Sequence, residues 1–190
     1  MFRIAVLLLS FLALLPARTA FAQAADTPFQ EALITNDLTK GDALVALSNS
    51  GASSFTPTNG QICVNVYAMS GNGAAPSPVS ACCTCKMQPN GFASLSVNNE
   101  ILAGVSPRPR NVAIKVMGTV GTGACSAGSP GALTTGMLAW QNTPQGPLTG
   151  SPGTPTIPFI PSTLSALELN RLISQCGALT ARTCSAACAP

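Results

Sequence analysis

Apolar and polar residues alternate with a period of two in several segments of the chain, the pattern of half-buried β-strands. The clearest segments are 62–69 (ICVNVYAM), 92–97 (FASLSV) and 111–118 (NVAIKVMG). Weaker candidates are 42–51 (DALVALSNSG) and 136–142 (GMLAWQN). Because turn-rich stretches of Gly, Ser, Asn and Pro separate these runs, the pattern favours an antiparallel sheet or β-sandwich over helix-linked parallel strands.

Near the C-terminus the apolar spacing changes from that of a strand to that of a helix. Leu164, Leu167, Leu172, Ile173 and Cys176 fall on one helical face, which predicts an α-helix over residues 163–176. Ser165 followed by Glu168 fits a capping box, and Gly177 occupies the position of a C-terminal cap.

The chain divides into four consecutive parts. Residues 1–22 combine an early Arg3, an apolar run and the small-x-small end Ala20-Phe21-Ala22, which is typical of a cleaved export signal. A β-rich domain is expected over 23–140. The segment 141–161 holds six of the sixteen prolines and is expected to be an extended linker on the surface. Residues 162–190 supply the helix and a cysteine-containing tail of the same domain.

The composition and charge of the chain indicate its location and exclude some classes of partner. Loss of Arg3 and Arg18 with the signal leaves seven basic residues against six acidic ones, so the formal net charge falls from +3 to +1. This balance argues against nucleic acid and anionic lipid as partners, because both need clustered Lys and Arg. No membrane span is expected after signal removal. We expect a secreted, periplasmic or cell-envelope protein whose partner is an extracellular protein, a surface or a second copy.

Eight cysteines, none of them in the signal, form an even set in an exported chain, which predicts four disulfides. Three of the eight crowd into ACCTC. The spacing Cys82-x-x-Cys85 also occurs in thiol–disulfide redox motifs, and four cysteine thiolates are able to bind a metal ion. Structural disulfides are favoured over a redox motif or a metal site, because the predicted compartment is oxidising. We therefore expect no metal or cofactor. The predicted bridging residues are Cys63, Cys82, Cys83, Cys85, Cys125, Cys176, Cys184 and Cys188.

The alternation of a strand constrains how these cysteines pair. In an extended segment Cys83 and Cys85 share one face and Cys82 occupies the other. Adjacent Cys82 and Cys83 are poorly placed to bridge each other. Candidate partners for the cluster are Cys63, Cys125 and Cys176, while Cys184 and Cys188 are expected to tie the tail to the helix or to each other; the sequence leaves this choice open.

The absence of histidine excludes Ser-His-Asp and Cys-His mechanisms and every His-ligated metal or haem site. Acid–base work would then fall mainly to six carboxylates, namely Asp26, Glu31, Asp37, Asp42, Glu100 and Glu168. The favoured prediction is a non-enzymatic structural or recognition protein that uses loops around 70–80, 104–111 and 119–136. The alternative is a small exported hydrolase with Glu100 and Glu168 as its carboxylate pair.

Several strings taken together resemble a known group of proteins. ICVNVY, CCTC, the NG turn with FASLSVNNEI, then SALELNRLISQCG and a terminal cysteine pair are similar to a group of uncharacterised exported bacterial proteins with a CxCxP-type cluster. The similarity spans about residues 43–188, although Lys86 follows Cys85 here and the next proline is Pro89. The resemblance implies a shared disulfide-stabilised domain and carries no activity, ligand or catalytic residue.

Overall fold

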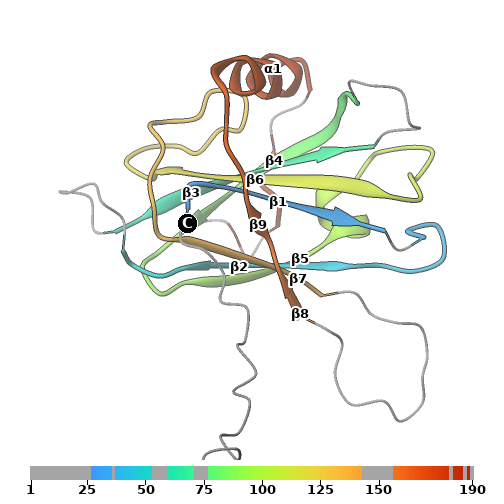
Figure 1. The fold of residues 1–190 in the computed structure, drawn as a ribbon, viewed down its shortest axis with the longest axis horizontal. Coiled ribbons are helices and arrows are strands. Elements are labelled where there is room, and N and C mark those ends of the chain that lie inside the picture. Colours follow the sequence, from blue (N-terminus) through green and yellow to red (C-terminus); the bar gives the residue numbers. More distant parts are fainter. Residues whose placement is uncertain are drawn as a thin grey trace, which may run out of the picture.

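A computed structural model describes residues 27–35, 37–52, 60–70, 77–142, 156–179, 182–185 and 188. These residues form two antiparallel β-sheets packed face to face, with a helix on one side (Figure 1). The expected fold class, a mainly antiparallel β-sandwich with one C-terminal α-helix and four disulfides, is confirmed. The predicted signal peptide over 1–22 lies outside the described residues.

The first sheet, sheet A, has five strands in the order β4 (Val79–Met87), β3 (Ile62–Met69), β6 (Val112–Val120), β1 (Phe29–Ile34) and β9 (Ile160–Pro161). The alternation that predicted β3 and β6 reflects two buried faces, since one side meets the second sheet and the other lies under the helix. All eight residues of β3 are buried. This strand is therefore the centre of the molecule.

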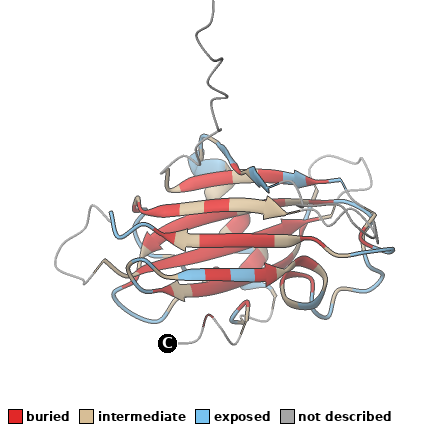
Figure 2. Ribbon diagram, turned by 90° about the horizontal axis from the view of Figure 1, so that it is seen from below, coloured by how far each residue is buried: buried red, intermediate tan, exposed pale blue. Residues whose placement is uncertain are grey.

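The second sheet, sheet B, has four strands in the order β5 (Phe92–Ser96), β2 (Leu44–Asn49), β7 (Met137–Asn142) and β8 (Thr156–Pro158). Its inward residues pack against sheet A in one core that includes Val45, Leu47, Leu95 and Met137. In β5 the exposed Phe92 and Ser94 alternate with the buried Ala93 and Leu95, which is the pattern of a half-buried strand. Figure 2 views the sandwich from the side of sheet B, where exposed and buried residues alternate along the lowest strand.

The end of the Pro-rich segment is part of the sandwich, whereas the sequence predicted a linker over 141–161. Within residues 156–161, β8 pairs with β7 of sheet B and β9 pairs with β1 of sheet A. Phe159, between the two strands, is 1% exposed and lies in the core between the sheets. One short segment thus closes an open side of the sandwich. The part of the expected linker over 143–155 lies outside the described residues.

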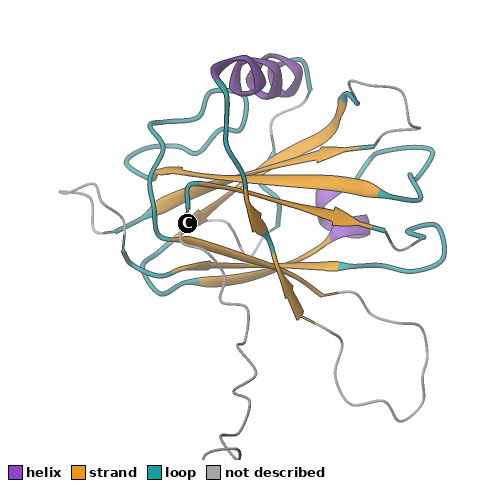
Figure 3. Cartoon of the chain, in the orientation of Figure 1, coloured by secondary structure: helices purple, strands orange, loops and turns teal. Residues whose placement is uncertain are grey.

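Two helical elements flank the sheets (Figure 3). α1 (Ala166–Gly177) covers the outer face of sheet A, and it begins three residues later than predicted. The hydroxyl half of the predicted capping box forms, because the Ser165 hydroxyl accepts a hydrogen bond from the Glu168 backbone N–H at 3.1 Å. The helix includes Gly177, and its C-cap is Ala178 rather than the predicted Gly177. The second element is one turn of π-helix, η1 (Val97–Ile101), which the sequence did not predict.

Candidate functional site

The cysteines form four bridges: Cys63–Cys125, Cys82–Cys176, Cys83–Cys184 and Cys85–Cys188. As the alternation predicts, Cys83 and Cys85 face the core between the sheets, while Cys82 faces α1. Of the expected partners of the ACCTC cluster, only Cys176 binds it. Cys63 and Cys125 bridge each other, and the two tail cysteines pair with β4 rather than with the helix or with one another. Four such bridges are typical of extracellular or periplasmic proteins.

The C-terminal tail continues sheet A beyond β4. Thr84 and Thr183 form a parallel bridge, in which the Thr84 N–H donates to the Arg182 carbonyl and the Cys184 N–H donates to the Thr84 carbonyl. Two disulfides fix this short pairing from the core side. The tail therefore covers the edge of β4, which would otherwise present unpaired backbone groups.

Arg182 attaches the tail to η1. Its guanidinium donates to the Glu100 carbonyl at 2.7 Å and to the Ile101 carbonyl. These are the last carbonyls of a helical turn, which lack partners within the helix and attract a cation. Burial lowers the pKa of the Arg182 guanidinium. The charged group is nevertheless the donor in both hydrogen bonds to η1. This guanidinium is committed to the fold.

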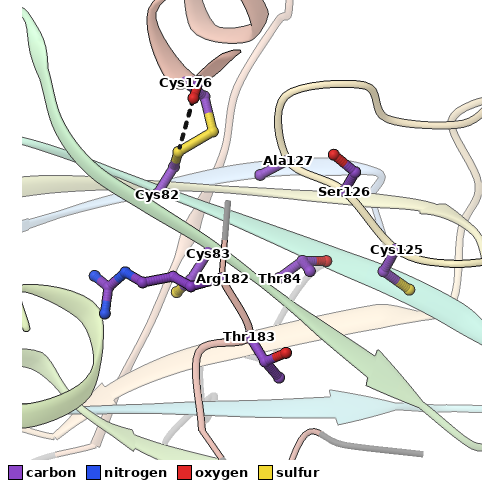
Figure 4. Close-up of a pocket in the computed structure, with 9 residues that line it drawn as sticks. All are labelled: Cys82, Cys83, Thr84, Cys125, Ser126, Ala127, Cys176, Arg182 and Thr183. Atoms are coloured by element: carbon purple, nitrogen blue, oxygen red, sulfur yellow. Dashed lines mark hydrogen bonds between the residues drawn. A yellow bond between two sulfur atoms is a disulfide. The ribbon is translucent and has the colours of Figure 1, made fainter. Parts of the chain in front are cut away.

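A pocket of about 190 Å³ lies where the C-terminal tail, β4 and α1 meet the Gly-rich loop, which is the connection 121–136 between β6 and β7 (Figure 4). Half-cystines from three bridges line it, together with Ser126, Ala127, Thr84, Thr183 and Arg182. In Figure 4 the Arg182 side chain extends away from Ser126 and Cys125. The 3.8 Å contact between Cys82 Sγ and the Cys176 carbonyl is a van der Waals approach, because a bridged sulfur has no hydrogen to donate. The pocket is a junction of cross-links.

The Gly-rich loop after β6 is fastened to the outer face of sheet A. The Cys63–Cys125 bridge holds it at one point, and the fully buried Tyr67 donates its hydroxyl to the Ala127 carbonyl at 2.8 Å. Burial raises the pKa of Tyr67 well above its usual range, so the phenol stays protonated as a donor. Part of the expected contact loop 119–136 is thus a structural cover for the sheet.

Glu168, one member of the alternative catalytic pair, lies on α1 in an ionic cluster. Its carboxylate accepts from Lys115 at 2.6 Å and from Arg171 at 2.9 Å. Burial alone would raise the pKa of Glu168, but the hydrogen bonds from Arg171 and Lys115 outweigh it and lower the pKa. Glu168 therefore joins α1 to β6.

Glu100, the other member, lies in the helical turn η1. Its carboxylate accepts from the Ser96 backbone N–H at 2.6 Å, while the Ser96 hydroxyl accepts from Asn99, which is a reciprocal helix cap. Glu100 and Glu168 thus lie on different elements, η1 at the end of sheet B and α1 outside sheet A (Figure 3). The structure does not bring them together.

A larger groove, of about 560 Å³, forms where two of the three expected contact loops meet. Ser70 lines it on one side and residues 105–111 line the other. Arg108 donates to the Asn98 carbonyl, which fixes its side chain beside the groove. Arg110 is exposed and lies near Asp37, whose pKa is lowered chiefly by a hydrogen bond from Thr39 and least by Arg110. Arg108 and Arg110, which are two positions apart in the sequence, both line this groove.

The described residues contain no group of three or more His, Cys, Asp or Glu that would hold a metal ion. None of the helices in the described ranges is long and apolar enough to cross a membrane. No family model, curated protein or solved structure matches the chain. The resemblance to uncharacterised exported bacterial proteins therefore stays a prediction.

Proposed function

We propose that this chain is an exported, non-enzymatic protein of the cell envelope or extracellular space that recognises a partner through the groove of Ser70 and residues 105–111. The observation that carries the proposal is the contrast between this groove and the rest of the molecule. Elsewhere the cysteines, Glu100, Glu168 and Arg182 are used to hold elements together. In the groove, the backbone carbonyl of Arg110 accepts a hydrogen bond from the Leu38 N–H, while its exposed guanidinium forms none of the described side-chain hydrogen bonds that join elements.

The chemistry of the groove favours an anionic partner, such as an acidic segment of an extracellular protein. Two guanidinium groups on a loop that also contains Pro107 and Pro109 present their donors with little loss of backbone freedom on binding. Its volume lies within the range of sites that hold a peptide side chain or a small ligand.

The binding part of the proposal is tested with an oligoglutamate peptide as the probe. Binding is followed by calorimetry at low and high salt for the wild-type chain and for Arg110→Gln. We expect the variant to bind several-fold more weakly and the wild type to lose affinity in high salt. Lys86→Gln is the matched control, because it removes one positive charge from a half-buried side chain of β4 that does not line the groove. Equal loss in both variants, or no binding by the wild type, contradicts the assignment.

The export part of the proposal is tested separately. Cells producing the full chain are fractionated, and the intact mass of the protein is measured before and after reduction. We expect a product that lacks the segment up to Ala22, is found outside the cytoplasmic membrane and gains about two hydrogens for each of its four bridges on reduction. A full-length cytosolic product with reduced thiols contradicts it.

A further inference from the structure

The four disulfides join cysteines that are never neighbours in their order along the chain. Each of the first four cysteines pairs with the fourth cysteine after it, as Cys63–Cys125, Cys82–Cys176, Cys83–Cys184 and Cys85–Cys188. The sequence separations are 62, 94, 101 and 103 residues. Every native bridge therefore forms across three other cysteines that lie closer along the sequence.

Much shorter loops compete for the same sulfur atoms before the sheets form. Cys82 and Cys85 are three positions apart, and Cys184 and Cys188 are four positions apart. In a flexible chain, the chance that two residues meet falls with about the 3/2 power of their separation, so these short loops close about 100-fold more often than the long native ones. Oxidation of the unfolded chain is therefore expected to form the bridges Cys82–Cys85 and Cys184–Cys188 first.

The non-native Cys82–Cys85 bridge is incompatible with the strand that contains both residues. In β4, Cys82 lies in the cluster under α1 and Cys85 lies in the core between the sheets, so the two side chains leave the strand on opposite faces. Three residues of a strand extend about 10 Å, whereas the Cα atoms of a disulfide lie less than about 7 Å apart. Since β4 pairs with the central strand β3, this bridge has to open before sheet A is complete.

The non-native Cys184–Cys188 bridge removes both covalent anchors of the tail. Cys83 and Cys85, which face the core between the sheets, then have no partner in the tail. The backbone pairing of Thr84 with Thr183 is short and lies beside these two disulfides. This bridge also has to open before the tail is fixed at the edge of β4.

Burial makes the native bridges the end point of exchange. Seven of the eight half-cystines are at most 4% exposed, and Cys125 is half-buried. Exchange requires a thiolate to reach a sulfur atom of the bridge. A bridge in a chain whose sheets are incomplete is open to attack, whereas the native bridges become inaccessible as α1 and the tail pack. Exchange therefore proceeds towards the native set.

We propose that this chain is a substrate of a thiol–disulfide isomerase, which opens the non-native bridges Cys82–Cys85 and Cys184–Cys188. Uncatalysed rearrangement of disulfides takes minutes to hours, so a chain with two favoured non-native bridges needs a catalyst to fold quickly. This relationship rests on the proposed function, because it requires the oxidising compartment to which export leads.

The reaction is an exchange with no net oxidation. A thiolate of the isomerase attacks one sulfur of the non-native bridge, forms a mixed disulfide and releases the other sulfur as a thiolate. When Cys82 is in the mixed disulfide, the Cys176 thiolate attacks its sulfur, forms the native bridge and returns the thiolate of the isomerase. One sulfur–sulfur bond breaks and one forms in each step. The preceding oxidation removes two electrons and two protons for each bridge, which a disulfide-donating oxidoreductase or oxidised glutathione accepts.

The test is oxidative refolding of the purified chain. The chain is reduced and unfolded in guanidinium, then diluted into reduced and oxidised glutathione with or without a dithiol isomerase. Samples are alkylated at intervals and their bridges are assigned by tryptic digestion and tandem mass spectrometry. The peptide 183–190, which follows Arg182, reports the Cys184–Cys188 bridge directly, and fragmentation of the peptide 41–86 assigns Cys82–Cys85.

Without the enzyme, we expect both short bridges to accumulate before the native set. With the enzyme, we expect the native set to form tenfold or more faster. An isomerase whose active-site cysteines are alkylated is the control for simple binding of the unfolded chain, and it is expected to leave the rate unchanged.

Two double variants separate the effect of the short loops from the number of bridges. Cys85→Ala with Cys188→Ala removes one native bridge together with both short non-native ones. Cys63→Ala with Cys125→Ala removes one native bridge and keeps both short ones. The acceleration by the isomerase is measured within each variant, so a difference in stability between the variants does not enter. We expect the acceleration to be at least threefold smaller in the first variant.

Four results overturn the inference. They are native bridges that form equally fast without the enzyme, early intermediates without the two short bridges, equal acceleration by the alkylated enzyme, and equal acceleration of the two double variants. The results for the wild type decide the matter where a variant fails to fold. An exported chain that refolds without the enzyme contradicts this inference alone, whereas a cytosolic chain with reduced thiols contradicts the proposed function as well.

Discussion

The disulfides of this fold close overlapping loops. The free energy of unfolding that is lost when one disulfide is removed is therefore not determined by the sequence separation of its two cysteines alone. We consider two double substitutions, one that removes Cys82–Cys176 and one that removes Cys63–Cys125, each by Cys→Ala. Their sequence separations are 94 and 62 residues. If each bridge acted alone, the loop-entropy relation would assign about 4.7 kcal/mol to the first and about 4.3 kcal/mol to the second.

The neighbouring bridges reverse this order. Cys82 is adjacent to Cys83, which is tied to Cys184, and Cys184 lies a short distance beyond Cys176. With that bridge intact, Cys82–Cys176 closes a ring of only about nine residues, for which the same relation gives about 2.6 kcal/mol. Cys63–Cys125 has no such neighbour and keeps about 4.3 kcal/mol. Removal of the shorter loop is therefore expected to destabilise the protein more, by about 1.7 kcal/mol.

The assay is guanidinium unfolding of the two variants and the wild type, with linear extrapolation to water. Non-reducing peptide mapping verifies that the remaining three bridges are intact in each variant. Burial does not produce the expected order, since Cys82 and Cys176 are both 2% exposed while Cys125 is half-buried. A larger loss for the Cys82–Cys176 variant would refute the idea that shared loops govern the contribution of each bridge.

Three further changes test other contacts. Phe159→Ala should cost about 3–4 kcal/mol in free energy of unfolding, since it empties the side of the sandwich between β8 and β9; a loss below about 1 kcal/mol by chemical denaturation would contradict that role. Arg182→Ala should speed limited proteolysis of the tail, with Arg182→Lys intermediate, and equal cleavage of all three proteins would argue against the contact with η1. The pKa of Glu168 is lowered in the fold, so its stabilising effect is complete above about pH 4.5 and is lost as the pH falls through the folded pKa; the stability gap between wild type and Glu168→Gln should close in acid, and a constant gap would contradict this.

The parts of the fold that the sequence predicted are those where local pattern and burial agree. β2, β3, β5, β6 and β7 all lie within or next to predicted strands, because their inward residues are apolar. β1 escaped prediction for the opposite reason. Gln30 points into the core of the sandwich, where it donates to the Met137 carbonyl at 2.9 Å, so a polar residue interrupts the apolar face of that strand.

Only part of the candidate site could be predicted from the sequence, for a related reason. Alternation placed Cys83 and Cys85 on one face and Cys82 on the other, but the choice among partners depends on which distant segments the fold brings beside β4. The same holds for Glu100 and Glu168, whose spacing along the chain carries no information about Ser96, Lys115 or Arg171. The groove, in contrast, involves two of the loops that the sequence predicted as contact surfaces, those around 70–80 and 104–111.

The two segments that the sequence described least well share one physical role, which is to close the sides of the sandwich. Residues 156–161 do so between β1 and β7 by inserting Phe159, and the tail does so at β4 through Cys184 and Cys188. Neither segment has a periodic pattern of its own, because each contributes a few anchoring side chains to surfaces made by other strands. A β-sandwich with charged residues at only 8% has few charges to place on its edges. Prolines in β8 and β9 and the disulfide-bound tail at β4 protect three of the four edge strands instead.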